Sequence, residues 1–158
     1  MILGGQMKTE SGRSLIEMLG VLAIGGVMTA AAYGTYHMLR TSQTRNLAIS
    51  HMEQIARNTK ILLEMRGDYS PVSIDYLIKN GALTDNIAPI GGDNWSITPG
   101  VRGETFAINL TDLSQGDCIY FATKEIKWAL QVNVNNIPNG RSESCMSAPK
   151  NLISVIVK

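Results

Sequence analysis

Two kinds of residue in this 158-residue chain could do chemistry by their type and position. The first is an acid: Glu17 follows Leu15 and Ile16 and stands directly before a stretch, 18–36, that carries no charged side chain. A carboxylate placed in hydrocarbon costs on the order of 3 kcal/mol, so it needs a cationic partner or a place in the headgroup region. Both interpretations are open at this point.

The second kind is a pair of cysteines, Cys118 and Cys145, both far beyond the apolar stretch. A pair allows a single intramolecular bridge. If this part of the chain is exported, an oxidising compartment favours that bridge, which would stabilise the fold by roughly 3–4 kcal/mol. The alternative is two buried free thiols in a cytosolic protein. The membrane-like segment upstream favours the disulfide.

Other chemistry has little support in the sequence. The two histidines, His37 and His51, are 14 residues apart on one predicted helix, which separates them by about 21 Å, too far to share a metal ion. The phosphate-binding loop, CxxC and HExxH patterns do not occur. We therefore predict no catalytic residue, no cofactor, no metal site and no enzymatic activity.

Four cationic residues of the C-terminal half could in principle contact DNA: Lys124, Lys127, Arg141 and Lys150. They are neither clustered in the sequence nor interleaved with aromatic residues, and the formal net charge is only +1. A solvated surface is expected, without a nucleic-acid partner or a small-molecule substrate. The sequons at Asn94 and Asn109 are short patterns that occur by chance, and no modification is expected there.

The apolar stretch is about as long as a helix that spans a bilayer. Its small residue, Gly12, stands before the run, whereas a cleavable secretory signal has its small-residue site after the run. The segment is therefore expected to be retained as a helix. Lys8 and Arg13 on one side and Arg40 and Arg45 on the other set its orientation only weakly.

The helical pattern continues beyond the apolar stretch. Apolar or small residues recur at steps of four and three, at Ala48, Met52, Ile55, Thr59 and Leu62. Much of the polar face comes from Arg45, Glu53, Arg57 and Lys60. Gly67 is a candidate C-cap, so the pattern predicts one helix from about Ser14 to Arg66. The alternative is a separate amphipathic helix for the second half; both can hold at once.

After Gly67 the chain predicts short elements separated by turns. A helix is expected at 73–79 and another at 117–130. Strands are expected at 105–110, where apolar residues alternate, and at 130–134 and 152–157. Glycines and prolines between 89 and 103 predict turns. The fold class is α+β: a long N-terminal helix covers one face of a C-terminal antiparallel sheet.

The string Gly12-Arg13-Ser14-Leu15-Ile16-Glu17-Met18-Leu19 resembles the processing motif of type IV prepilins and pseudopilins. The resemblance implies that a prepilin peptidase on the cytoplasmic face cuts after Gly12 and methylates the new amino terminus at Arg13. Glu17 would be fifth in the mature chain. The family usually has an apolar residue where this chain has Arg13. The leader begins at Met1 or, more typically for the family, at Met7.

The chemistry of that motif follows from charge. Cutting before Arg13 creates an α-amino group that is positive near neutral pH. In a bilayer or filament core, Glu17 of a neighbouring subunit can neutralise this amine, and an unpaired charge there is costly. Glu17 is thus predicted to set the register between subunits. In type IV filaments the helix can also unwind where this chain has Gly25, Gly26 and Gly34; close helix packing is the other explanation.

The C-terminal part resembles the type IVb pilin branch. The resemblance covers G-A-L at 81–83, P-I-G-G-D-N-W at 89–95, a first cysteine near a helix start, V-N-V-N at 132–135, a second cysteine and a terminal strand. It implies a pilin-like roll in which Cys118 and Cys145 form a disulfide that holds the C-terminal region on the sheet. That branch has longer leaders than this chain.

The predicted organisation is a leader at 1–12, a transmembrane or filament-core helix at 13–36, its amphipathic second half at 37–66 and a globular head at 67–158. The resemblance implies a pilus subunit, made as an inner-membrane precursor with a periplasmic head and then assembled into an extracellular homopolymer by the pilus machinery. The alternatives are a pseudopilin of a secretion system, whose major members often use a calcium site instead of a disulfide, and a signal-anchored bitopic binding protein that does not polymerise.

Overall fold

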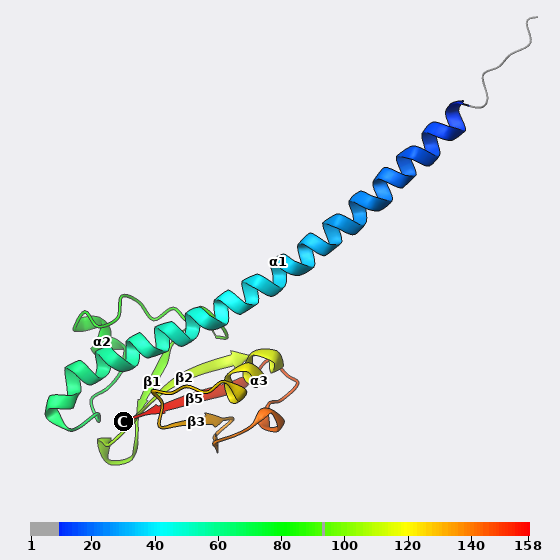
Figure 1. The fold of residues 1–158 in the computed structure, drawn as a ribbon. Coiled ribbons are helices and arrows are strands. Elements are labelled where there is room, and N and C mark those ends of the chain that lie inside the picture. The colour runs from blue at the N-terminus through cyan, green and yellow to red at the C-terminus, as the bar shows by residue number, and fades with distance from the viewer. Residues whose placement is uncertain (1–9, 93) are drawn as a thin grey trace, which may run out of the picture. The chain divides into compact units, whose positions relative to one another are not determined.

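The computed structural model describes residues 10–92 and 94–158, and it describes side chains from Leu15 onward. Residues 1–9, which belong to the predicted leader, and Asp93 lie outside this description. The chain divides into two units after Ser42, and each is considered by itself. Figure 1 shows the fold.

One helix, α1 (Glu10–Leu63), contributes to both units, and a 3-10 turn, η1 (Glu64–Arg66), follows it. Gly67 ends this helical segment in the left-handed conformation, with φ +66°, and its N–H donates to the carbonyl of Glu64 at 3.0 Å. Glycine reaches this conformation without the steric cost of a Cβ atom. The predicted helix and its C-cap are confirmed.

The second unit is built on a five-stranded antiparallel sheet in the order β1-β2-β5-β3-β4. The strands are β1 (Ser96–Pro99), β2 (Phe106–Leu113), β3 (Gln131–Val134), β4 (Ile137–Pro138) and β5 (Asn151–Val157). The C-terminal strand β5 lies in the middle, between β2 and β3 (Figure 1). Both halves of the sheet therefore depend on the last residues of the chain.

The α+β fold with an antiparallel sheet is confirmed, but two edge strands were not predicted. β1 lies among the residues for which turns were expected, and its Pro99 is tolerated because β1 is an edge strand with one side unpaired. β4 pairs with β3 across a tight turn in which Asn135 and Asn136 have φ of 50° and 66°. Asparagine is one of the few residues that adopts such angles readily.

The helix predicted at 117–130 is wrong in its second half. α3 spans Gln115–Thr123, with Ser114 as its N-cap, and Lys124 already has extended backbone angles. Beyond this point the chain turns toward the sheet, where the N–H of Leu130 donates to the carbonyl of Ile156 at 2.9 Å. Pairing with the sheet thus overrides the helical pattern of the segment.

The second half of α1 packs on the sheet through the predicted face. Ala48, Met52 and Thr59 are fully buried and Ile55 is nearly so; at the end of the face Leu63, rather than the predicted Leu62, is the buried leucine. The hydroxyl of Thr59 donates to the carbonyl of Ile55 at 2.7 Å, so this buried polar group is satisfied within the helix. The sheet side of this core includes Phe106, Ile108, Leu110, Ile153 and Val155.

A short helix, α2 (Ile74–Lys79), confirms the element predicted at 73–79. Ser73 is its N-cap and accepts a hydrogen bond from the N–H of Tyr76 at 3.1 Å. The loop after α2 is attached to α1, because the side-chain amide of Asn58 donates to the carbonyl of Ala82 at 2.6 Å.

The connection between α1 and α2 is fixed to the turn before β2. The N–H of Tyr69 donates to the carbonyl of Gly103 at 2.8 Å, and burial raises the pKa of the Tyr69 hydroxyl. Hydrogen bonds from the hydroxyl and then the N–H of Ser70 lower the pKa of Asp68. Gly103 has φ +69°, and a Cβ there would meet Asp68 Oδ1, so this close approach requires glycine.

Candidate functional site

The first unit presents an apolar helix with an exposed surface. The large apolar side chains from Leu15 to Leu39 are all exposed, each by more than half of its surface. This part of α1 is long and apolar enough to cross a membrane, and the segment 18–39 would span about 33 Å, close to the thickness of a bilayer core. Since an apolar surface of this extent is unfavourable in water, the segment requires lipid or other helices around it.

The threonines of this segment are satisfied by the helix itself. The hydroxyl of Thr29 donates to the carbonyl of Gly25 at 2.7 Å, and the hydroxyl of Thr35 donates to the carbonyls of Ala31 and Ala32 at 3.1 and 2.9 Å. Such bonds allow hydroxyl groups to enter an apolar environment without a water partner. These two hydroxyl groups therefore add little to the cost of transferring the helix from water.

Glu17 is an exposed acid at the beginning of this apolar surface. None of the side chains that the structure describes forms an ion pair with it. Gly12 and Arg13 belong to the backbone of α1, but their environment lies outside the described side chains. The predicted cleavage, methylation and register roles therefore remain predictions.

The helix runs without interruption through its glycines. For Gly20, Gly25, Gly26 and Gly34, no described atom apart from the chain neighbours and the nearby backbone of the helix itself lies within 4 Å of the position that a Cβ would take. Packing within the unit thus gives no reason for glycine at these positions. Without side chains, these positions let the backbone of another helix approach closely. Unwinding of the helix on assembly remains a prediction.

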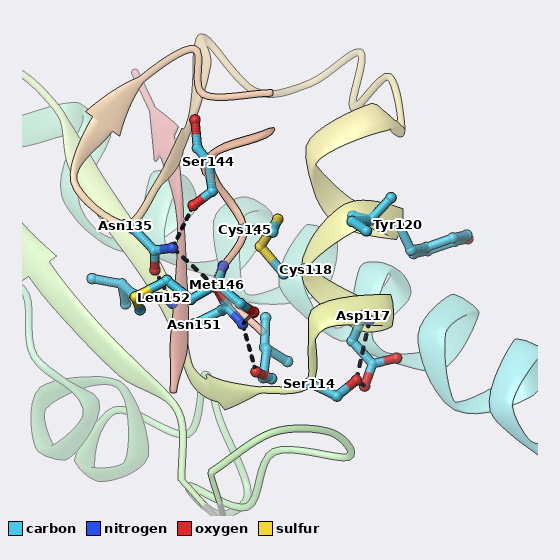
Figure 2. The surroundings of a disulfide bond; sticks show 12 residues. Ser114, Asp117, Cys118, Tyr120, Asn135, Ser144, Cys145, Met146, Asn151 and Leu152 are labelled. Atoms are coloured by element: carbon cyan, nitrogen blue, oxygen red, sulfur yellow. Dashed lines mark hydrogen bonds between the residues drawn. A yellow bond between two sulfur atoms is a disulfide. The ribbon is translucent and has the colours of Figure 1, made fainter. Parts of the chain in front are cut away.

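In the second unit, Cys118 and Cys145 form the predicted disulfide, with their Cα atoms 5.9 Å apart (Figure 2). Cys118 is fully buried in α3, and Cys145 follows the 3-10 turn η3 (Ser142–Ser144). The bridge therefore ties α3 to the loop that leads into the central strand β5.

A buried asparagine, Asn151, holds the same loop from its other end (Figure 2). Its side-chain amide donates to the carbonyls of Leu113, Met146 and Ala148 at 3.1, 2.9 and 3.1 Å. Its side-chain oxygen accepts from the N–H of Met146 at 2.7 Å and from the side chain of Asn135 at 3.0 Å. One amide group thus joins the end of β2, the loop and the start of β5.

Asn135 completes this network between β3 and β5. Its amide also donates to the carbonyl of Ser144 at 2.7 Å, and its oxygen accepts from the N–H of Leu152 at 2.8 Å. Asn151 was not singled out from the sequence, and Asn135 was noted only as part of the V-N-V-N run, without this role. The available signal was an asparagine at the boundary of an apolar strand, a position where its amide can replace backbone partners.

An ion pair joins α1 to α3. Arg45 Nε donates to Asp117 Oδ1 at 2.8 Å, and the two side chains are only 24% and 15% exposed. The guanidinium also lies 5.1 Å from the centre of the Tyr120 ring, whose hydroxyl donates to the side chain of Asn46 at 3.1 Å. Arg45 was predicted as part of the polar face of the helix, and the structure shows that it is partly buried there against α3. The sequence could not show its partner, 72 residues away.

Replacing Arg45 by methionine is expected to lower the free energy of unfolding by about 1–2 kcal/mol, because Asp117 stays mostly buried without its cationic partner. The matched control is Arg57→Met. The Arg57–Glu53 pair has similar geometry, at 3.0 Å, but is 71% and 41% exposed, so its loss should cost less than about 0.5 kcal/mol. Urea unfolding of the full chain in detergent measures both. Equal effects of the two variants would contradict a special role for Arg45.

The remaining candidate residues are placed as follows. Asn109 is buried, and its amide donates to Thr98 Oγ1 at 3.2 Å, so this sequon is inaccessible in the folded unit. Asn94, in contrast, is exposed. His37 packs beside Tyr33 in the first unit, with ring centres 5.8 Å apart, and His51 lies in the second. Within the described part of the chain, no group of three or more His, Cys, Asp or Glu side chains could hold a metal ion.

Comparison with known proteins supports the fold. No protein-family model matches the chain, and no curated protein sequence matches it. A solved structure does match: TcpA, a type IV pilin from Vibrio cholerae El Tor biotype, with a TM-score of 0.62 and 12% sequence identity. The match covers 73% of this chain and 99% of that chain. At this identity the likeness concerns the fold, and the chain has a type IV pilin-like fold with the disulfide Cys118–Cys145.

Proposed function

We propose that this chain is a structural subunit of a type IV pilus, with no catalytic activity of its own. The observation that carries the proposal is the combination of two features in one chain. An exposed apolar helix with an acid, Glu17, at the start of its apolar surface leads into a head with a type IV pilin-like fold. Such a helix is stored in a membrane until it packs against copies of itself, since water is unfavourable for it.

The proposed life of the subunit begins in the inner membrane, with the head in the periplasm. A prepilin peptidase removes residues 1–12 and methylates Arg13; the assembly machinery then adds the subunit to an extracellular filament. Residues 13–36 form the filament core, 37–66 the amphipathic half of the helix and 67–158 the head. Glu17 of one subunit pairs with the amine of Arg13 in the next, which selects the correct register.

The test is the N-terminal peptide of the protein in surface filaments of its native host. Filaments are sheared from the cells, and the peptide is sequenced by mass spectrometry. The expected result is a chain that begins at Arg13, carries one added methyl group and is a repeated component of the filament. A chain that keeps residues 1–12, or one that is absent from filaments and confined to the inner membrane, would contradict the proposal.

The same measurement separates the other candidates. A processed chain that never reaches the surface would identify a pseudopilin, and an unprocessed chain in the inner membrane would identify a bitopic binding protein. The disulfide favours the pilin among these candidates. Major pseudopilins often use a calcium site instead of a disulfide, and the described part of this chain has the disulfide Cys118–Cys145.

A further inference from the structure

A cleft of about 380 Å³ lies in the second unit, apart from the apolar helix. It is lined by the C-terminal end of α3 with the segment that follows it, 122–126, by 129–132 and by the turn at 139–141. The volume falls within the range of small-ligand sites. Since all of these residues belong to one compact unit, the cleft is a property of the single subunit.

The cleft brings together two of the four cationic residues that the sequence left scattered. Lys124 and Arg141 both line it, whereas Lys127 and Lys150 do not. Both lining cations are exposed, and Arg141 forms no ion pair with any described residue. One carboxylate, Glu125, also lines the cleft, so its side chains carry a net charge of +1 (two cations and one anion).

The position of Arg141 is set by the fold. The preceding turn is closed by the N–H of Gly140, which donates to the carbonyl of Ile137 at 3.1 Å. A Cβ on Gly140 would stand 2.6 Å from Val134 Cβ, so only glycine allows this approach to β3. The disulfide then holds Cys145, four residues further on, against α3. The backbone of Arg141 is thereby held at the same cleft as that of Lys124.

The remaining lining has the character of a carbohydrate site. Asn139 and Gln131 offer amide groups that donate and accept hydrogen bonds, as sugar hydroxyls do, although one N–H of Gln131 already donates to the side chain of Asn133. The hydroxyl of Thr123 donates to the carbonyl of Ile119 at 2.8 Å, so toward a ligand it can only accept. Ala122, Ala129 and Leu130 offer apolar surface for the face of a sugar ring. The guanidinium of Arg141 can bind a carboxylate through two parallel hydrogen bonds. Lys124, whose ammonium lies 6.0 Å from the centre of the Tyr120 ring, adds a second positive charge nearby.

We propose that this cleft binds an acidic saccharide through the carboxylate of a uronic acid residue. A nucleic acid is a poorer fit, because affinity for a phosphate backbone grows with the number of cations along it, and here a carboxylate accompanies only two. The proposal does not depend on polymerisation, since each subunit carries the complete cleft.

The test uses the full chain in detergent and a pair of matched disaccharides. Cellobiouronic acid carries a carboxylate where cellobiose carries a hydroxymethyl group, so the two probes differ in the charged group alone. Saturable shifts of the amide NMR signals of 122–126 and 139–141 are expected for the acid, with a dissociation constant on the order of 1 mM for so small a probe. Cellobiose should bind at least about tenfold more weakly.

The chain offers a matched pair of variants. The double variant K124Q/R141Q is expected to lose at least tenfold in affinity for the acid. The control K127Q/K150Q removes the same charge from exposed residues outside the cleft and should leave the affinity unchanged. All four side chains are exposed, so both variants are expected to fold.

Three outcomes would overturn the proposal: equal losses in the two double variants, equal binding of the acid and the neutral sugar, or no saturable binding. Tighter binding of a single-stranded oligonucleotide, weakened equally by all four substitutions, would also overturn it, because it would indicate a diffuse charge effect. None of these outcomes bears on processing or filament assembly, so the proposed function is tested separately.

Discussion

Replacing both cysteines by serine is expected to lower the free energy of unfolding of the second unit by about 3.5 kcal/mol. The bridge joins residues 27 positions apart, and its loss releases a loop of that length in the unfolded chain. Because the loop leads directly into β5, the central strand, the sheet and α3 should lose stability together. Urea unfolding of the full chain in detergent, followed by near-ultraviolet circular dichroism, measures the loss.

Two controls separate the covalent bond from the contacts around it. Reduction of the unchanged protein should give the same loss as the double serine variant. The variant Ser144→Ala should cost little, since Ser144 contributes its backbone carbonyl to Asn135 and not its hydroxyl. A loss below about 1 kcal/mol for the double serine variant would instead indicate that Asn135 and Asn151 hold the loop without the disulfide.

Replacing Glu17 by glutamine is expected to leave membrane insertion intact and to reduce incorporation into filaments by at least about a hundredfold. This expectation depends on the proposed function. A buried charge that loses its partner costs about 3–5 kcal/mol, and each 1.4 kcal/mol is about a tenfold change in an equilibrium. Glutamine keeps the shape of the side chain, so the effect reports the charge. The measurement is the ratio of subunit in sheared filaments to subunit in the inner membrane.

Thr35→Val is the matched control in the same unit. Its hydroxyl is bonded to its own helix, so its removal should change neither insertion nor assembly. Substitution of Glu17 by aspartate keeps the charge on a shorter side chain and should restore part of the incorporation. Filaments built from the glutamine variant at the normal level would refute the register role of Glu17.

Three sets of contacts help to position the central strand β5: the disulfide, the asparagine network and the Arg45–Asp117 pair. The central strand is the last to be synthesised, so the sheet cannot close until β5 lies between β2 and β3. α3 is tied to α1 by the ion pair and to the loop before β5 by the disulfide. Asn151 then fixes the start of β5 to the end of β2. These contacts explain how the loop between β4 and β5 is held in place although it has little regular secondary structure.

The features that could be predicted are those whose cause lies in nearby residues. An apolar run without charge predicts a membrane-length helix, and steps of three and four predict the buried face of its second half. Gly67 ends the helical segment and Ser73 begins α2 because each acts on backbone groups within a few positions. The alternation at 105–110 likewise predicted the core of β2.

The features that could not be predicted depend on partners far along the chain. β1 and β4 form where β2 and β3 offer them backbone groups, and at four and two residues they are too short to show as a pattern in the sequence. α3 ends at Thr123 because the chain then pairs with β5. Arg45 is half buried because Asp117 meets it from another helix.

The amino-acid sequence by itself determined the long helix, its exposed apolar surface, the acid at its beginning and the fold class, since periodicity and local backbone chemistry suffice for these. Only the tertiary structure decided which strands pair, which polar groups become buried and which cations share a cleft. These depend on burial and on hydrogen bonds between segments that the chain brings together when it folds, and no local pattern specifies them.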